Sequence, residues 1–199
     1  MNISNQNLNK TFIVVGSGSI GNRHYNNLSK LFDNVVQVSW RNFSREDFKF
    51  LLRTHPHPVI FISTSTQIRM ELIDLAIEFK APVYIEKPVA FIQSDLDEIY
   101  SAVDSGALMG CVGFMTRYHP VILKLSEMDM TSLVYANLSI GHDVMQWRKN
   151  WLFSKSYASD PYGGGVLLDL CHEVDIAQLL FGELNAKSVF SHASKKFKQ

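Results

Sequence analysis

The chain has 199 residues, of which 46% are hydrophobic and 19% are charged, as in ordinary soluble globular proteins. Its formal net charge is zero, which gives no electrostatic footprint for a nucleic-acid partner. Its two cysteines, Cys111 and Cys171, are too few for a disulfide framework, and their apolar surroundings predict core positions in a reducing compartment. The polar first ten residues lack a secretory signal and no apolar run is long enough to span a membrane, so we expect a cytoplasmic protein.

The first part of the chain alternates short apolar strands with helices. Strands are predicted over residues 12–15, 35–38, 59–62, 83–85 and 109–114. Helices are predicted over 19–32, 45–52 and 69–79, and from a cap at Ser94 to Gly106. Alternation with short connections favours a parallel sheet covered on both faces, so we predict an α/β, doubly wound Rossmann domain over residues 1–118.

After residue 118 the pattern changes. A helix is predicted over 120–127, an alternating strand over 133–140, an irregular stretch over 141–162, a helix after three glycines over 163–181, and a further strand from 189. We therefore treat residues 119–199 as part of a second domain.

A glycine-rich turn joins the first strand to the first helix. Gly16, Gly18 and Gly21 form a GxGxxG pattern between a β-branched run and residues at helical spacing. In a dinucleotide site these glycines permit the tight turn, the approach of a pyrophosphate and close packing of the helix on its strand. The alternative is a tight turn that binds nothing.

The end of the second predicted strand bears on the choice of cofactor. A NAD site usually has an acidic residue about 20 residues beyond the glycines, whereas this chain has Ser39-Trp40-Arg41 there. Arg41 and Ser39 suit a 2′-phosphate, and Arg23 could add charge, so we expect NADP to be slightly favoured over NAD. Alternatively, Arg41 is a solvated loop residue.

Two further segments carry chemistry. Glu86-Lys87-Pro88 follows a short apolar strand, at the edge of a parallel sheet where ligands bind, although a solvated loop pair is the simpler reading of the tripeptide. In the glycine-rich segment, Asp169, His172 and Glu173 are three or four residues apart and would share a helix face, as would His172 and Asp175. A carboxylate beside a histidine suits a proton acceptor, but an ordinary surface pair fits as well. No second ligand cluster supports a metal site, and we predict none.

These segments together resemble the Gfo/Idh/MocA family, the glucose–fructose oxidoreductase and inositol dehydrogenase group. The resemblance rests on four motifs in order, GSGSIGNRH at the start, EKP at 86–88, VGFMTRYHP at 112–120 and GGGVLLDLCHEVD at 163–175. It implies an NAD(P)-dependent oxidoreductase acting on a sugar or sugar-derived alcohol. Lys87 would polarise the substrate hydroxyl, His172 would take its proton, and Asp169 would hold the substrate or assist.

The resemblance and the residues together give a set of expected contacts. The expected cofactor contacts are Gly16, Gly18, Ser19, Ile20, Gly21, Arg41, Ser63, Thr64, Glu86 and Lys87. The expected substrate contacts are Arg117, Tyr118, Trp147, Arg148 and Asp169. Arg148 could pair with a phosphate or carboxylate, which would suit a sugar nucleotide of surface polysaccharide synthesis or an acidic sugar.

The chain also departs from the family pattern. Arg69 stands where a histidine is common, and Asp169 is one residue closer to His172 than usual. Family members continue further and complete an open, mostly antiparallel sheet in an α+β second domain, for which this chain offers only residues 130–140 and 189–193. We therefore expect an incomplete second domain in a truncated chain, with homo-oligomers formed through the sheet if it is completed. The alternatives are a catalytically silent NAD(P)-binding protein or a truncated, inactive member; a methyltransferase fits the later motifs poorly.

Overall fold

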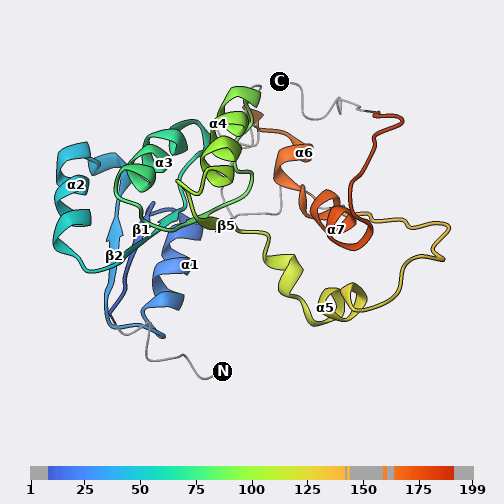
Figure 1. Ribbon diagram of the computed structural model, residues 1–199, viewed down its shortest axis with the longest axis horizontal. Coiled ribbons are helices and arrows are strands. Elements are labelled where there is room, and N and C mark those ends of the chain that lie inside the picture. The colour runs from blue at the N-terminus through green and yellow to red at the C-terminus, as the bar shows by residue number, and fades with distance from the viewer. Residues whose placement is uncertain (1–8, 142, 144–158, 161–163, 191–199) are drawn as a thin grey trace. The chain divides into compact units, whose positions relative to one another are not determined.

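A computed structural model describes residues 9–141, 143, 159–160 and 164–190 (Figure 1). The chain divides into two compact units, Met1–Gly113 and Phe114–Gln199. Each unit is described by itself. None of the helices in the described ranges has the length and apolar character needed to cross a membrane.

The first unit contains one parallel sheet of five strands. The strands are β1 (Thr11–Val15), β2 (Val35–Val38), β3 (Pro58–Ile62), β4 (Val83–Ile85) and β5 (Gly110–Val112), in the order β2-β1-β3-β4-β5. Their last residues lie in one register row, which runs Val38, Val15, Ile62, Ile85, Val112 across the sheet. The loops that leave the carboxyl ends of the strands therefore all start at the same edge. The predicted parallel Rossmann-like sheet is confirmed.

Four helices cover the two faces of the sheet (Figure 1). They are α1 (Ser19–Leu28), α2 (Arg45–Thr54), α3 (Arg69–Glu78) and α4 (Gln93–Asp104). The larger core joins alternate strand residues such as Ile13 and Ile60 to Phe48 of α2, Leu72 of α3 and Ile99 of α4. The smaller core joins the intervening residues Phe12 and Val14 to Leu28 of α1. The alternation arises because successive strand residues point to opposite faces.

Several predicted element ends are wrong by a few residues. α1 ends at Leu28 rather than residue 32, since the chain turns back on itself with the Leu31 and Phe32 amides donating to the Leu28 carbonyl. α4 begins at Gln93 with Ile92 at its N-cap, so Ser94 lies inside the helix instead of capping it. The predicted core position of Cys111 is also wrong, because β5 is an edge strand that leaves this residue exposed, and Cys171 is only half-buried.

The second unit contains helices and irregular chain in its described part. The short helix η4 (Met115–Tyr118) leads to α5 (Pro120–Ser126), and α6 (Val166–Asp169) is followed by α7 (His172–Phe181). The strand predicted over 133–140 is absent, and residues 189 and 190 form no strand; Val134 and Phe190 are 98% and 94% exposed. A strand needs a neighbour for its N–H and C=O groups, and no pairing partner lies in the described residues of this unit. The open antiparallel sheet is therefore not confirmed.

Candidate functional site

The glycine turn after β1 has the shape that a dinucleotide site requires. Gly16 has a φ of +123°, and a Cβ there would lie 2.6 Å from the Ser63 carbonyl oxygen. A Cβ on Gly21 would collide with the backbone of Gly16, so this glycine allows the close approach of α1 to the turn. A Cβ on Gly18 would meet nothing within 4 Å. The middle glycine therefore faces the open space through which a ligand would approach.

The amino end of α1 is free to bind an anion. Gly18 is the N-cap, no side chain in the described part of the chain caps the helix, and its first turn holds no acidic residue. The amides of Ser19, Ile20 and Gly21 thus begin a helix whose dipole favours negative charge at this end. These features fit the diphosphate of a dinucleotide.

Hydroxyl groups and a cation gather after β2, where a NAD site usually has a carboxylate. The Ser17 hydroxyl donates to the Ser39 hydroxyl at 3.1 Å, across the gap between the glycine turn and the end of β2. Arg41 follows in the short helix η2 (Trp40–Asn42) and is exposed. Gln37, on β2, donates its amide to the Gly16 carbonyl at 3.0 Å, which ties this strand to the turn.

Two buried hydroxyls follow β3. The side-chain oxygens of Ser63 and Thr64 have no hydrogen-bond partner in the described structure. Buried polar atoms are nearly always paired, so two neighbouring orphans beside the glycine turn fit a site for polar ligand groups. This observation supports the expected cofactor contacts at Ser63 and Thr64.

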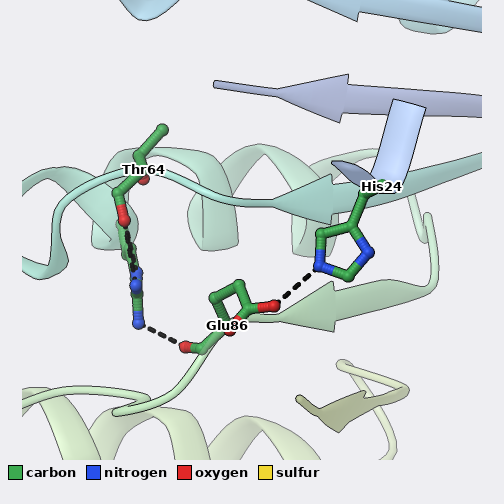
Figure 2. Close-up of polar contacts among 4 residues, drawn as sticks. His24, Thr64 and Glu86 are labelled. Carbon is green, nitrogen blue, oxygen red and sulfur yellow. Dashed lines mark hydrogen bonds and ion pairs between the residues drawn. The ribbon is translucent and has the colours of Figure 1, made fainter. Parts of the chain in front are cut away.

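Glu86, Lys87 and Pro88 form the loop directly after β4. The Glu86 carboxylate lies 2.6 Å from His24 Nε2, and Figure 2 shows His24 reaching it from the neighbouring helix α1. The His24 ring packs against the stacked rings of Phe61 and Tyr84, at centroid distances of 5.7 and 5.0 Å. Glu86 is thus engaged within the protein, while Lys87 is half-buried at the carboxyl edge of the sheet.

Arg69, which stands where the resemblance predicts a histidine, is buried beneath this edge. Its Nη2 donates to the Thr64 carbonyl at 2.9 Å, and its Nη1 donates to the carbonyls of Glu86 and Pro88. Desolvation by burial lowers the pKa of Arg69 to about 10, against an opposing effect of Glu86, so the guanidinium is charged at neutral pH. The sequence carried two signals for this residue: it stands where a histidine is common, and it is a cation at the first position of a predicted helix.

His172 and Asp169 lie on different helices of the second unit. α6 ends at Asp169, Leu170 and Cys171 break the helix, and His172 is the first residue of α7. The predicted single helix face for Asp169, His172 and Glu173 is therefore wrong, because the i, i+3 and i, i+4 rule holds only within one continuous helix. The His172 ring lies 6.0 Å from the Phe114 ring, edge to face, and its Nδ1 is buried without a hydrogen bond in the described structure.

Asp175 serves Arg117 rather than His172. The Arg117 guanidinium donates to both oxygens of the Asp175 carboxylate, at 2.9 Å from Nε and 2.5 Å from Nη2. This hydrogen bond raises the pKa of Arg117 above its usual value. Arg117, an expected substrate contact, is therefore already committed to an internal pair; Tyr118 is exposed, and Trp147 and Arg148 lie outside the described residues.

No group of three or more His, Cys, Asp or Glu side chains suited to a metal ion occurs among the residues whose placement is described. Lys87 belongs to the first unit and His172 to the second.

Comparison with known proteins bears on the family. No protein-family model matches the chain. The chain is 27% identical over 194 residues to the Bacillus subtilis protein named uncharacterized oxidoreductase YrbE, covering 85% of this chain and 53% of the relative. It is 25% identical over 203 residues to myo-inositol 2-dehydrogenase of Thermotoga maritima, covering 91% of this chain and 57% of the relative. Both matches agree with the resemblance to the Gfo/Idh/MocA family that the sequence motifs show.

A solved dehydrogenase structure shares the fold. The WlbA (WbpB) dehydrogenase of Thermus thermophilus, in complex with NAD and UDP-GlcNAcA, matches with a TM-score of 0.64 at 16% identity, over 87% of this chain and 63% of that one. The chain spans a little more than half the length of the curated relatives that it matches.

Proposed function

We propose that this chain, which resembles the Gfo/Idh/MocA family, forms the cofactor-binding part of an NAD(P)-dependent oxidoreductase that acts on a sugar or sugar-derived alcohol. The observation that carries the proposal is the Gly16–Gly18–Gly21 turn, with its open middle glycine, at the uncapped amino end of α1. The named relatives support the reaction class, since one is called an oxidoreductase and the other a myo-inositol 2-dehydrogenase.

The residues that would hold the cofactor have separate tasks. The first-turn amides of α1 bind the diphosphate, and the orphan hydroxyls of Ser63 and Thr64 bind polar groups beside it. Bound there, the nicotinamide supplies the acceptor or donor of the hydride that the substrate carbon loses or gains. Asp or Glu is absent at the end of β2, so Ser39 and Arg41 favour NADP at the ribose end.

Lys87 and His172 would handle the substrate hydroxyl. The ammonium group of Lys87 stabilises the negative charge that develops on the substrate oxygen. The imidazole of His172 accepts the hydroxyl proton in oxidation and returns it in reduction. Asp169 would hold the substrate, and a sugar nucleotide is one candidate substrate class, which WlbA's complex with UDP-GlcNAcA supports.

Cofactor titration and turnover test the proposal in two steps. Fluorescence titration of the full chain with NADH and NADPH should give saturable binding, tighter for NADPH. A panel of sugars, inositols and sugar nucleotides should then oxidise or reduce bound cofactor, and Lys87→Ala and His172→Ala should each lose most of that rate. Binding without turnover across the panel would instead identify a silent NAD(P)-binding protein. Turnover within a few-fold of wild type in both variants would remove their assigned roles.

A further inference from the structure

We propose that Arg69 is a positioning residue. It holds the loop after β3 and the loop after β4 in a fixed arrangement relative to each other, and so determines the position of Lys87. The inference rests on the proposed function for the role of Lys87, but the clamp itself is a property of the first unit. It extends the site from residues that touch ligands to a residue that sits behind them.

The contacts of Arg69 define the clamp. Strand pairing stops at Ile62 and Ile85, so the carbonyls of Thr64, Glu86 and Pro88 lie beyond the reach of the sheet ladder. One guanidinium binds all three of them. Figure 2 shows the contacts at Thr64 and Glu86. Its planar fork of donors can serve acceptors on two loops at once, which a lysine ammonium on a single flexible stem does less well.

The buried position of the Arg69 guanidinium is unfavourable in free energy, which indicates a specific structural role for the side chain. Its side chain is only 4% exposed, and burial of a cation carries a desolvation penalty. It is also the first residue of α3, the end of a helix where a positive charge is disfavoured. The carbonyl contacts offset these two costs, and they lie on both sides of the Lys87 residue.

Lys87 is therefore held by its neighbours in sequence. The Glu86 carbonyl and the Pro88 carbonyl both bind Arg69, and the Glu86 carboxylate binds His24 from α1. The backbone on either side of Lys87 has little freedom to move, so the ammonium group projects from a fixed point. Reactions of this kind are sensitive to small displacements of the reacting groups, at roughly 100-fold in rate for about 1 Å.

Amide hydrogen exchange on the full chain tests the clamp without any need for activity. The reporters are the amides of Ser63, which donates to the Val15 carbonyl, and Glu86, which donates to the Ile62 carbonyl. In Arg69→Met and Arg69→Lys these two amides should exchange about 10-fold faster or more, because charge-assisted hydrogen bonds that hold the edge are lost. The amide of Ile60, bonded to the Pro82 carbonyl in the core, should keep its wild-type rate.

Controls separate positioning from general stability. Arg45→Met removes an arginine from the first turn of α2, whose ion pair with Glu71 is exposed, and should change none of the three amides. Methylguanidinium at millimolar concentration should restore slow exchange of Ser63 and Glu86 in Arg69→Ala, whereas the same concentration of sodium chloride should not. Unchanged exchange of Ser63 and Glu86 in Arg69→Met would overturn the clamp. Equal acceleration at Ile60 would make Arg69 a core-stability residue only.

Turnover gives a second readout, which depends on the proposed function. Arg69→Lys should lower kcat about 10-fold to 100-fold with little change in substrate KM, and should lower it no further in a Lys87→Ala background. An equal loss in both backgrounds would show that Arg69 does not act through Lys87. If the wild type turns over none of the sugars, the proposed function fails, while the exchange experiment still decides whether the clamp exists.

Discussion

Arg117 and Asp175, far apart in the sequence, form a two-pronged ion pair within the second unit. Asp175 is 5% exposed and Arg117 is 41% exposed, so the pair joins a buried carboxylate on α7 to a guanidinium at the rim of η4. The guanidinium also lies over the Phe114 ring, 5.8 Å from its centroid. The pair therefore fixes α7, and with it His172, against the segment that opens the second unit.

Arg117→Gln should destabilise this unit. The substitution leaves the Asp175 carboxylate buried without its cation, and we expect a loss of about 1–2 kcal/mol, reduced from the value for a fully buried pair because Arg117 is partly solvated. Hydrogen bonding to Asp175 raises the pKa of Arg117 above its ordinary value. The guanidinium therefore keeps its charge throughout the neutral and mildly alkaline range, and the stability that the pair contributes does not change there. Urea unfolding at pH 6 and pH 9 should therefore give the same loss. Lys124→Met, which breaks an exposed pair with Glu127, is the control and should cost under about 0.5 kcal/mol.

The two glycines at the start of α1 should respond differently to alanine. Gly18→Ala places a Cβ in open space, so thermal stability should stay near wild type while NADH affinity falls about 10-fold or more, since the phosphates lose their close approach. Gly21→Ala drives a Cβ into the Gly16 backbone and should cost about 1–3 kcal/mol of stability as well as binding. Thermal unfolding and NADH titration measure both effects. Wild-type affinity in Gly18→Ala would argue that the turn binds no dinucleotide.

Arg41→Ala tests the preference for NADP. An exposed arginine that pairs with a 2′-phosphate should contribute about 1 kcal/mol, so NADPH should bind about five-fold more weakly while NADH affinity stays unchanged. The control is Arg53→Ala, which removes an arginine of α2 away from the end of β2. The Arg53 guanidinium lies over the Phe79 ring, 5.5 Å from the ring centroid. Equal weakening of NADH and NADPH would assign Arg41 to general charge attraction. Tighter binding of NADH than NADPH to the wild type would end the preference itself.

The thiol of Cys111 should react slowly despite its exposure. Burial of part of the side chain raises the pKa of the Cys111 thiol above its usual value. The reactive thiolate is therefore scarce at neutral pH, and alkylation should still be accelerating with each pH unit at pH 9. Mass spectrometry of iodoacetamide labelling in Cys171→Ser, with the urea-unfolded chain as reference, measures this profile. A rate that levels off below pH 8 in the folded chain would contradict it.

The first unit was largely predictable from local sequence because each of its elements carries its own signal. The strand over 83–85 is three apolar residues between a turn and a charged loop, and the structure has it at the same residues. The glycine turn was predictable because a side chain at Gly16 or Gly21 would collide with neighbouring backbone. This geometry requires glycine at both positions, and the requirement is visible in the sequence as a spacing pattern. The Arg69 contacts were not predictable, because they join carbonyl groups of residues far apart in the chain, and every residue has a carbonyl.

The second unit shows where local signals mislead. The alternation over 133–140 suits a strand, but strand formation depends on a partner, which the pattern of one segment does not reveal. The spacing of Asp169 and His172 suits one helix face, but the helix breaks at Leu170, which no glycine or proline announces. The pairing of Asp175 with Arg117 depended on the tertiary position of η4, so sequence spacing favoured the nearer His172 instead.

The common end row of the five strands sets how this protein tolerates changes in length. Each strand residue adds about 3.3 Å and alternates between faces, so deletion of one residue within β4 would draw the Lys87 loop back by that distance and turn Tyr84 to the opposite face. The same deletion in the loops that precede β3 or β5, at the other edge of the sheet, would leave the row in place. The length of each strand thus determines how far its loop extends beyond the row from Val38 to Val112.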